Sequence, residues 1–139
     1  MKKFFSVSPL WAQQGLAIIR IVVGLFMVYH GWEVFDEKKM KGYLDWDSFK
    51  GFSSPAVMVY MGKIAELAGG ILFCFGIFTR LAAVIIAFTM LYVCFFVGHG
   101  RIWYEDQYPF LFVLLAMVFF FTGPGKWSID QILFRKNNV

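Results

Sequence analysis

The sequence predicts an all-α integral membrane protein, folded as an antiparallel four-helix bundle with one long interfacial loop between its first two spans. Composition is the first indication: 60% of the residues are hydrophobic and 16% are charged, whereas about a quarter are charged in a typical soluble domain. The second is that several apolar runs approach the ~20 residues that a helix needs to cross a bilayer. With 139 residues, we expect a single transmembrane domain covering residues 1–139.

Four apolar segments are the expected spans, at residues 14–34, 56–78, 81–97 and 108–122. Open sheets are excluded because lipid cannot satisfy the hydrogen bonds of their edges. A membrane barrel would need segments of about ten residues with alternating polarity, and the sequence has none. The spans are therefore predicted to be helices, and mostly short connections favour antiparallel packing.

The first eleven residues resemble the start of a signal peptide, with two lysines followed by aromatic residues. However, the apolar run that follows continues to Phe35 without a small-residue cleavage site. We therefore expect an interfacial lead-in, with Phe4, Phe5 and Trp11 at the level of the lipid headgroups.

Residues 36–55 form the one long connection, with mixed charge and several aromatic residues. Because about twenty structureless residues would be unusual, we expect a short interfacial helix or a flap over the mouth of the bundle. Gly123-Pro124-Gly125 should end the last span, and residues 127–134 could then form one or two interfacial helical turns.

The basic residues flank the apolar segments in short clusters and form no groove with interleaved aromatics, which excludes nucleic-acid binding. Near the spans, six Lys and Arg residues lie on the side of the termini and five on the opposite side. This near tie gives a weak bias in orientation. The six lie in short segments tight against the spans, so we expect a multi-pass protein with cytoplasmic termini.

Charged groups inside apolar spans are costly and mark candidate functional sites. At about 1.5 Å per residue from the side of the termini, His30 lies at ~24 Å and Glu33 at ~28 Å in the first span. In the second span, Glu66 lies at ~18 Å and Lys63 at ~22 Å. Side chains lean toward the N-terminus of their own helix, which brings His30 toward Glu66 and Glu33 toward Lys63. We predict these two pairs.

Arg20 is the remaining charge of the first span, at ~9 Å on the same scale. Its lean widens its distance from Glu66, so two alternatives stay open: a pair with Glu66, or a guanidinium that reaches the near surface. In either case Arg20 is a charge anchor. Small residues at Gly24, Gly31, Gly62 and Gly70 would let the first two helices approach closely, and they could equally serve packing alone.

His99 ends the third span at the level of His30, next to Trp103 and Tyr104, and we expect a polar and aromatic mouth there. Two histidines could recruit haem or a metal, but their spacing matches no recognised ligand motif, so we expect no metal site. A quinone-head or proton-handling site fits better, and a purely structural network fits equally well. Cys74 and Cys94 lie at different depths, ~6 and ~21 Å, which excludes a disulfide between them.

The chain resembles the DoxX family of small four-helix membrane proteins. The matching pieces are Arg20 with Gly24 and His30-Gly31-Trp32, then Ala65-Glu66-Leu67-Ala68-Gly69-Gly70, Gly76-Ile77-Phe78-Thr79-Arg80-Leu81-Ala82-Ala83, and the closing Gly123-Pro124-Gly125-Lys126-Trp127-Ser128-Ile129-Asp130. The resemblance implies four spans in a prokaryotic inner membrane. The family is named for a membrane subunit of archaeal thiosulfate:quinone oxidoreductase, and other members are linked to thiol and oxidative-stress systems. Its recurrent arginine and glutamate correspond to Arg20 and Glu66.

Together these features predict an accessory, non-catalytic subunit of a membrane redox system, since no separate catalytic domain is visible. It would bind a quinone or another small amphipathic ligand within the helices, contact a redox partner subunit, and could form a homo-oligomer. The alternative is a small-molecule transporter or a membrane scaffold without electron transfer. The candidate ligand or proton-handling residues are His30, Glu33, Lys63, Glu66 and His99.

Overall fold

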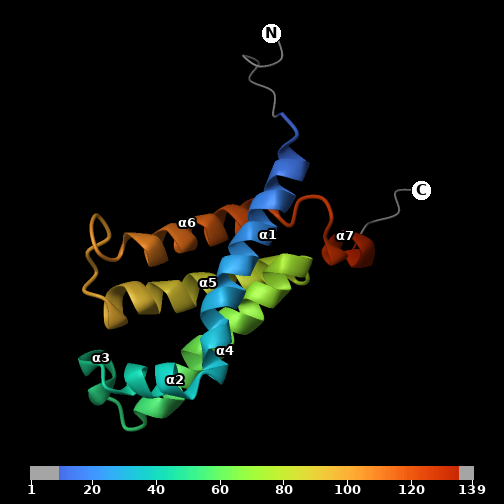
Figure 1. The fold of residues 1–139 in the computed structure, drawn as a ribbon. Helices are drawn as coiled ribbons and strands as arrows, with labels where there is room; N and C mark the ends of the chain where they lie inside the picture. The colour runs from blue at the N-terminus through green and yellow to red at the C-terminus, as the bar shows by residue number, and fades with distance from the viewer. Residues whose placement is uncertain (1–9, 135–139) are drawn as a thin grey trace.

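The computed structural model describes residues 10–134, and every regular element within them is helical (Figure 1). The elements are α1 (Ala12–Gly31), the 3-10 turn η1 (Trp32–Phe35), α2 (Glu37–Leu44), α3 (Asp47–Lys50), α4 (Pro55–Phe75), α5 (Thr79–Tyr92), the π-helical turn η2 (Val93–Val97), α6 (Gln107–Thr122) and α7 (Ile129–Phe134). The predicted interfacial positions of Phe4 and Phe5 lie outside the described residues.

Three helical stretches are long and apolar enough to cross a membrane: Ala12–Phe35, Pro55–Phe75 and Thr79–Val97. They coincide with the first three predicted spans to within a few residues. The fourth, α6, is apolar but has only 16 residues, fewer than the ~20 that usually span hydrocarbon. The all-α class is therefore confirmed, with three helices of spanning length among the described residues.

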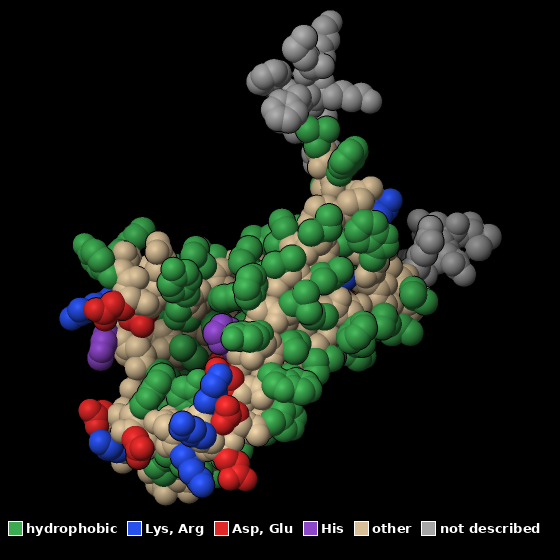
Figure 2. Space-filling model, in the orientation of Figure 1, with side chains coloured by type: hydrophobic (Ala, Val, Ile, Leu, Met, Phe, Trp, Pro, Cys, Tyr) green, Lys and Arg blue, Asp and Glu red, His purple; other side chains and the backbone are tan. Residues whose placement is uncertain are grey.

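The four long helices associate as two pairs (Figure 1). α1 packs along α4, α5 packs along α6, and α4 joins the pairs through its contact with α5. The pairs lie close together near the α4–α5 turn and diverge toward their other ends, where α2 and α3 lie (Figure 1). On the face seen in Figure 2, hydrophobic side chains cover the long helices, and the charged ones gather over α2–α3 and the far end of the α5–α6 pair.

The apolar core lies where the two pairs meet. Its buried members come from all four long helices and include Met27, Phe73, Ile86 and Phe119. The rings of Phe73 and Phe119 meet edge to face with centroids 5.1 Å apart, an arrangement that aromatic pairs prefer. This core fixes α4 between α1 and the α5–α6 pair.

Glycines allow α1 and α4 to touch backbone to backbone. A Cβ added at Gly70 would lie 2.7 Å from the amide nitrogen of Val28 and 2.9 Å from the carbonyl oxygen of Gly24. Gly31 likewise faces the backbone of Leu67. The predicted small-residue contact is confirmed at these positions. Gly62 differs, because nothing lies within 4 Å of a Cβ placed there.

The segment between α1 and α4 is largely helical rather than an extended loop. The Asp36 side chain caps α2 by accepting hydrogen bonds from the backbone amides of Lys38 and Lys39. Met40 and Phe49 are buried against Val59 of α4. The alternative of a short helix within residues 36–55 is confirmed, since the segment contains α2 and α3. The buried contacts of Met40 and Phe49 hold both helices against α4.

α3 also contacts the other helix pair. The Ser48 hydroxyl donates to the carbonyl oxygen of Val97 at the end of the π-helical turn, at 3.0 Å. The segment of α2 and α3 therefore links α4 to η2.

The C-terminal segment folds back across the start of α1 and the α4–α5 turn. α6 ends at Thr122, and Gly123 and Gly125 take positive φ values of 81° and 71°, which glycine adopts without steric cost. The Lys126 amide then donates to the Gln13 carbonyl at 3.0 Å, and the Asp130 amide to the Gly76 carbonyl at 2.9 Å. The predicted helix end and the following helical turns, here α7, are both present.

Arg20 fastens this segment to α1. Its side chain is fully buried, and its guanidinium donates to the backbone carbonyls of Pro124 and Trp127, the latter at 2.8 Å. The side chain extends toward the N-terminal end of α1, as the lean of helical side chains predicts. Neither sequence alternative is correct in detail: Glu66 pairs with Lys63 instead, and Arg20 does not reach solvent. Its acceptors are backbone carbonyl groups of the non-helical chain between α6 and α7.

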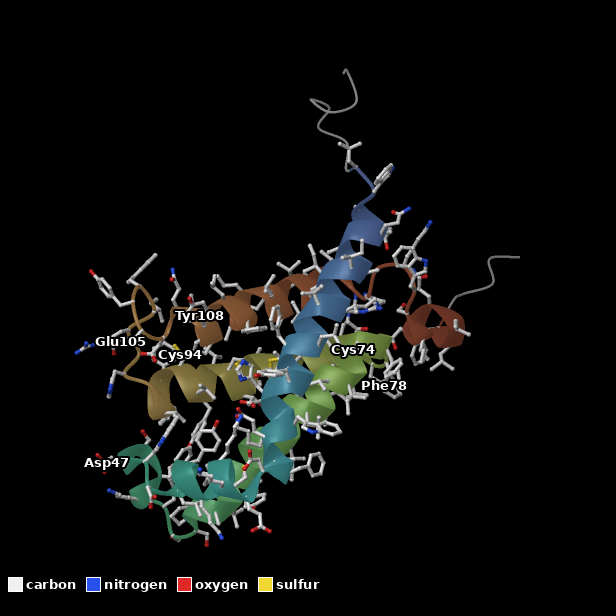
Figure 3. All side chains as sticks on the ribbon, in the orientation of Figure 1. Asp47, Cys74, Phe78, Cys94, Glu105 and Tyr108 are labelled. Atoms are coloured by element: carbon white, nitrogen blue, oxygen red, sulfur yellow. The ribbon has the colours of Figure 1, made fainter. Side chains whose placement is uncertain are left out.

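Cys74 of α4 and Cys94 of η2 are both free thiols. They lie well apart in Figure 3, so the exclusion of a disulfide between them is confirmed.

Two matched glycine changes on α4 test the backbone contact. Gly70→Ala should lower the free energy of unfolding by about 1–3 kcal/mol, because its methyl group would collide with the α1 backbone. Gly62→Ala should be neutral or slightly stabilising, since alanine favours helix and has space there. Thermal unfolding in detergent, followed by circular dichroism, measures both; equal effects would contradict the close contact.

The anchoring role of Arg20 predicts a local effect at the C-terminal segment. Arg20→Lys keeps the charge but loses the fork that spans two carbonyl groups, and hydrogen bonds to charged groups contribute about 1.5–3 kcal/mol each. We expect faster amide hydrogen exchange over residues 124–134 than in the parent protein. Arg80→Lys, a change at an exposed arginine, is the control, and unchanged exchange in Arg20→Lys would refute the anchor.

Candidate functional site

A cleft of about 250 Å³ opens between the two helix pairs on the side where they diverge. Every long helix contributes to its wall, and α2 and α3 cover it. The apolar lining residues are Met27, Phe49, Met58, Val59, Met90, Val93, Val97, Pro109 and Phe112; Gly62 also lines it, and the remaining lining residues are His30, Tyr43, Trp46, Lys63, Glu66 and Tyr108. The cleft is therefore apolar over most of its wall and polar where α1, α2 and α4 meet.

Lys63 is the centre of the polar wall. Its Nζ lies 3.0 Å from Oε2 of Glu33 and 3.0 Å from Oε2 of Glu66, and it also donates to the backbone carbonyl of His30 at 3.4 Å. The side chains of Lys63 and Glu33 are each 14% exposed and that of Glu66 is 7% exposed. The predicted Glu33–Lys63 pair is confirmed, and Lys63 is shared with a second carboxylate.

Glu33 has further donors from α2. The Tyr43 hydroxyl donates to Oε2, and the Lys39 ammonium donates to Oε1 at 2.9 Å. Burial, and then the hydrogen bond to the Glu33 carboxylate, raise the pKa of Tyr43, so its hydroxyl stays a proton donor at neutral pH. The Lys63 ammonium also sits 4.9 Å from the centre of the Tyr43 ring, within the range of a cation–π contact.

Tyr43 is the site residue that sequence reasoning missed, because it appears there only as an aromatic member of a long connection. The sequence signal that could have identified Tyr43 is Asp36, an N-cap residue that begins an eight-residue helix with Tyr43 in its last turn. That helix presents Met40 to the core and Tyr43 to the cleft. Tyr43 of α2 thus adds a hydrogen bond to the ion pair that Glu33 and Lys63 form between α1 and α4.

His30 lines the cleft, but the predicted hydrogen bond to Glu66 is absent from the contacts of residues 10–134. Its imidazole packs edge to face against Tyr29, with centroids 5.5 Å apart, and makes no hydrogen bond to another described side chain. Glu66 uses Oε2 for Lys63. His30 and Glu66 therefore share one cleft without a direct bond, and the imidazole remains available to a ligand.

His99 is not part of this cluster. It follows η2 on the loop that leads to α6, where its side chain is exposed and its amide donates to the Asp106 carboxylate at 2.9 Å. Trp103 and Tyr104 on the same loop are 80% and 81% exposed. The two histidine side chains lie apart in Figure 2. Within the described residues, no group of three or more His, Cys, Asp or Glu side chains could hold a metal ion.

The family model named DoxX matches residues 15–99, a range that contains Arg20 and the entire cluster of Glu33, Lys63 and Glu66. The chain belongs to the DoxX family. The DoxX match covers α1 to η2 and the loop start, and it leaves α6 and the C-terminal segment outside.

Three curated proteins resemble this DoxX chain along most of their length. An uncharacterised protein of Haemophilus influenzae is 31% identical over 130 residues, covering 87% of this chain and 92% of the relative. A Bacillus subtilis protein named "Putative oxidoreductase CatD" is 25% identical, with coverage of 97% and 93%. The inner membrane protein YqjF of Escherichia coli is 28% identical, with coverage of 88% and 94%. No solved structure matches the chain.

Lys63→Met should be the most damaging single change in the cluster. It leaves Glu33 and Glu66 without their shared cation, and breaking a buried ion pair in this way typically costs about 3–5 kcal/mol. Thermal unfolding in detergent measures the loss. Lys41→Met, which removes an exposed partner of Glu37, should change stability by less than about 1 kcal/mol.

Exchanging the charges of Glu33 and Lys63 distinguishes a shared lysine from an isolated pair. An isolated pair would tolerate the double exchange. Here the new glutamate at position 63 would face Glu66, so the exchange should be as unstable as Lys63→Met or worse, because two carboxylates would then meet. Full rescue by the double exchange would contradict the shared arrangement.

Proposed function

We propose that this protein is an accessory subunit of an inner-membrane redox system that binds a quinone, or a similarly small amphipathic ring, in the cleft between its helix pairs. The supporting observation is the cleft itself, which combines apolar walls with a polar end inside a membrane protein. In this proposal α6 crosses the membrane as a fourth span, both termini are cytoplasmic, and a redox partner subunit carries the catalytic domain.

The size and donors of the cleft fit a ring-shaped headgroup. Its volume of about 250 Å³ is a little below the roughly 300–1,000 Å³ typical of ligand pockets, which suits a single ring with its tail outside. Quinone carbonyl oxygens need hydrogen-bond donors. His30 and Trp46 line the cleft, and neither the imidazole of His30 nor the indole N–H of Trp46 makes a hydrogen bond within residues 10–134.

Two other polar groups of the cleft, the Lys63 ammonium and the Tyr43 hydroxyl, are already engaged. Lys63 directs its ammonium to Glu33, Glu66 and the His30 carbonyl, and Tyr43 donates to Glu33. Lys63 and Tyr43 therefore hold the carboxylates of the cluster in place and do not contact the ring in this proposal. His30 and Glu66 are then the groups that would hold or pass a proton beside the ring, because an imidazole and a carboxyl group can each accept and release a proton.

A bound quinone would supply the capacity to carry two electrons and two protons between partners. The chain's own contribution is to bind the ring, exclude water with the α2–α3 segment, and provide proton acceptors. The names of two relatives are consistent with this assignment: one is "Putative oxidoreductase CatD" and the other "Inner membrane protein YqjF".

Gly62 offers a direct test of the cleft. A Cβ at this position meets nothing within 4 Å, so Gly62→Phe should fill the cleft without disturbing the helix contact. We expect short-chain ubiquinone and menaquinone analogues to quench the tryptophan fluorescence of the purified protein saturably, and Gly62→Phe to weaken this at least about tenfold, since the ring would collide with the new side chain.

Met117→Phe is the matched control, because Met117 is 46% exposed and does not line the cleft. Trp46→Phe should remove most of the quenching if the ring lies beside that residue. Quenching that is linear and indifferent to Gly62→Phe would reject quinone binding. Substrate uptake into vesicles that survives quinone depletion would instead favour the transporter alternative.

A further inference from the structure

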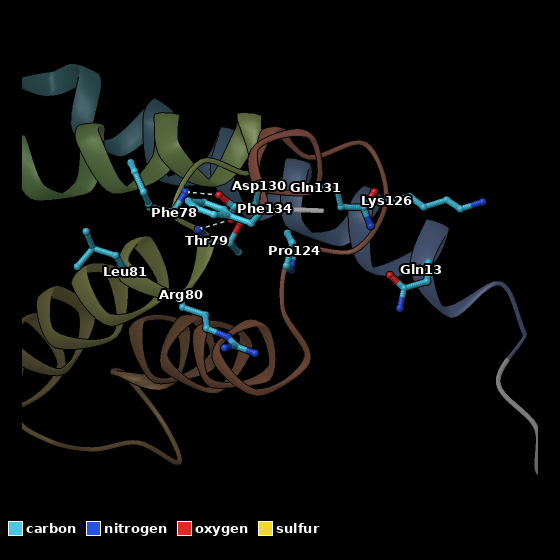
Figure 4. Close-up of a pocket in the computed structure, with 10 residues that line it drawn as sticks. All are labelled: Gln13, Phe78, Thr79, Arg80, Leu81, Pro124, Lys126, Asp130, Gln131 and Phe134. Carbon is cyan, nitrogen blue, oxygen red and sulfur yellow. Dashed lines mark hydrogen bonds between the residues drawn. The ribbon is translucent and has the colours of Figure 1, made fainter. Parts of the chain in front are cut away.

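A second, larger groove lies at the end of the molecule opposite α2 and α3, the helices that cover the cleft. It has a volume of about 890 Å³ and is bordered by the start of α1, the α4–α5 turn, the chain after α6, and α7 (Figure 4). Its lining residues are Gln13, Phe78, Thr79, Arg80, Leu81, Pro124, Lys126, Asp130, Gln131 and Phe134. The groove shares no lining residue with the cleft.

The position of this groove corresponds to a membrane–water boundary. α1 and α5 begin at it, and α4 and α6 end beside it, so the ends of all four long apolar helices meet there. Trp11 and Trp127, each next to a groove-bordering segment, are 81% and 63% exposed. Exposed tryptophans are typical of the headgroup level of a bilayer.

The groove carries two cations, Arg80 and Lys126, that pair with no carboxylate of the described residues. Arg80 and Lys126 are exposed, lie on either side of Pro124 in Figure 4, and form no ion pair within residues 10–134. The nearby carboxylate is Asp130, and both of its oxygens are occupied: they accept the backbone amides of Phe78 at 2.7 Å and Thr79 at 2.8 Å. The cations are therefore available to an external anion.

The remaining lining adds amide groups and apolar surface. Gln13 and Gln131 offer side-chain donors, while Phe78, Leu81 and Phe134 form an exposed apolar edge. An anion held here would thus lie beside apolar surface at the boundary of the hydrocarbon. Free phosphate would use only the polar half, whereas a lipid headgroup with its acyl chains would use both.

We infer that this groove binds the headgroup of an anionic phospholipid, with Arg80 and Lys126 contacting the phosphate and the acyl chains lying along Phe78, Leu81 and Phe134. Basic residues next to membrane spans attract anionic lipids in this way. The site is independent of quinone binding in the cleft.

Native mass spectrometry of the full-length protein in detergent tests the assignment. Delipidated protein is titrated with phosphatidylglycerol and, separately, with phosphatidylcholine. We expect one phosphatidylglycerol to be retained in preference to phosphatidylcholine. Arg80→Gln combined with Lys126→Gln should raise the apparent Kd for phosphatidylglycerol about thirtyfold, the effect of removing two cations near the membrane surface, and leave phosphatidylcholine unchanged.

Two control variants and a competition with inorganic phosphate make the result decisive. Lys38→Gln with Lys41→Gln removes the same charge from α2 and should leave the lipid preference intact. Arg80→Lys with Lys126→Arg keeps both charges and should retain the lipid. Equal retention of both lipids, an equal loss in the α2 variant, or displacement of the lipid by millimolar inorganic phosphate would overturn the assignment.

Discussion

A guanidinium buried among apolar helices must find its acceptors inside the protein, since neither lipid nor water is there to supply them. Arg20 finds them in the carbonyl groups of Pro124 and Trp127. Arg20 of α1 thereby fixes the path of the chain that follows α6. The α4–α5 turn, held by Asp130, and the groove beside it take their shape from this attachment.

The same constraint operates at the other end of α1, with a different solution. Glu33 and Glu66 approach each other across the glycine-lined contact of α1 and α4, and Lys63 lies between them. Lys63 pairs with both carboxylates, so these three charges compensate one another at one end of the cleft. The His30 imidazole and the Trp46 indole make no hydrogen bond within residues 10–134, and in the proposed site they are donors to a ligand beside a rigid charged support.

The divergence of the helix pairs creates the cleft, and the covering helices make it usable. α2 and α3 rest on α4 through Met40 and Phe49 and reach η2 through Ser48. The π-helical turn brings Val93 and Val97 into the cleft wall, and such turns often occur at functional sites. The long helices thus form the cleft, and the short segments between them cover it and complete its wall.

The sequence by itself determined the helical membrane class, the positions of the first three spans, the Glu33–Lys63 pair and the close approach at Gly24 and Gly70, whereas it predicted a fourth span where the structure has the shorter helix α6. These follow from local rules: hydrocarbon admits few polar groups, and helix direction fixes which way a side chain leans. Only the tertiary structure decided that Lys63 serves two carboxylates, that Tyr43 completes the cluster, and that His99 lies outside it. The tertiary structure also decided that Arg20 donates to backbone carbonyl groups. Every residue has a carbonyl group, so the sequence does not indicate which carbonyl groups of the chain between α6 and α7 will face α1.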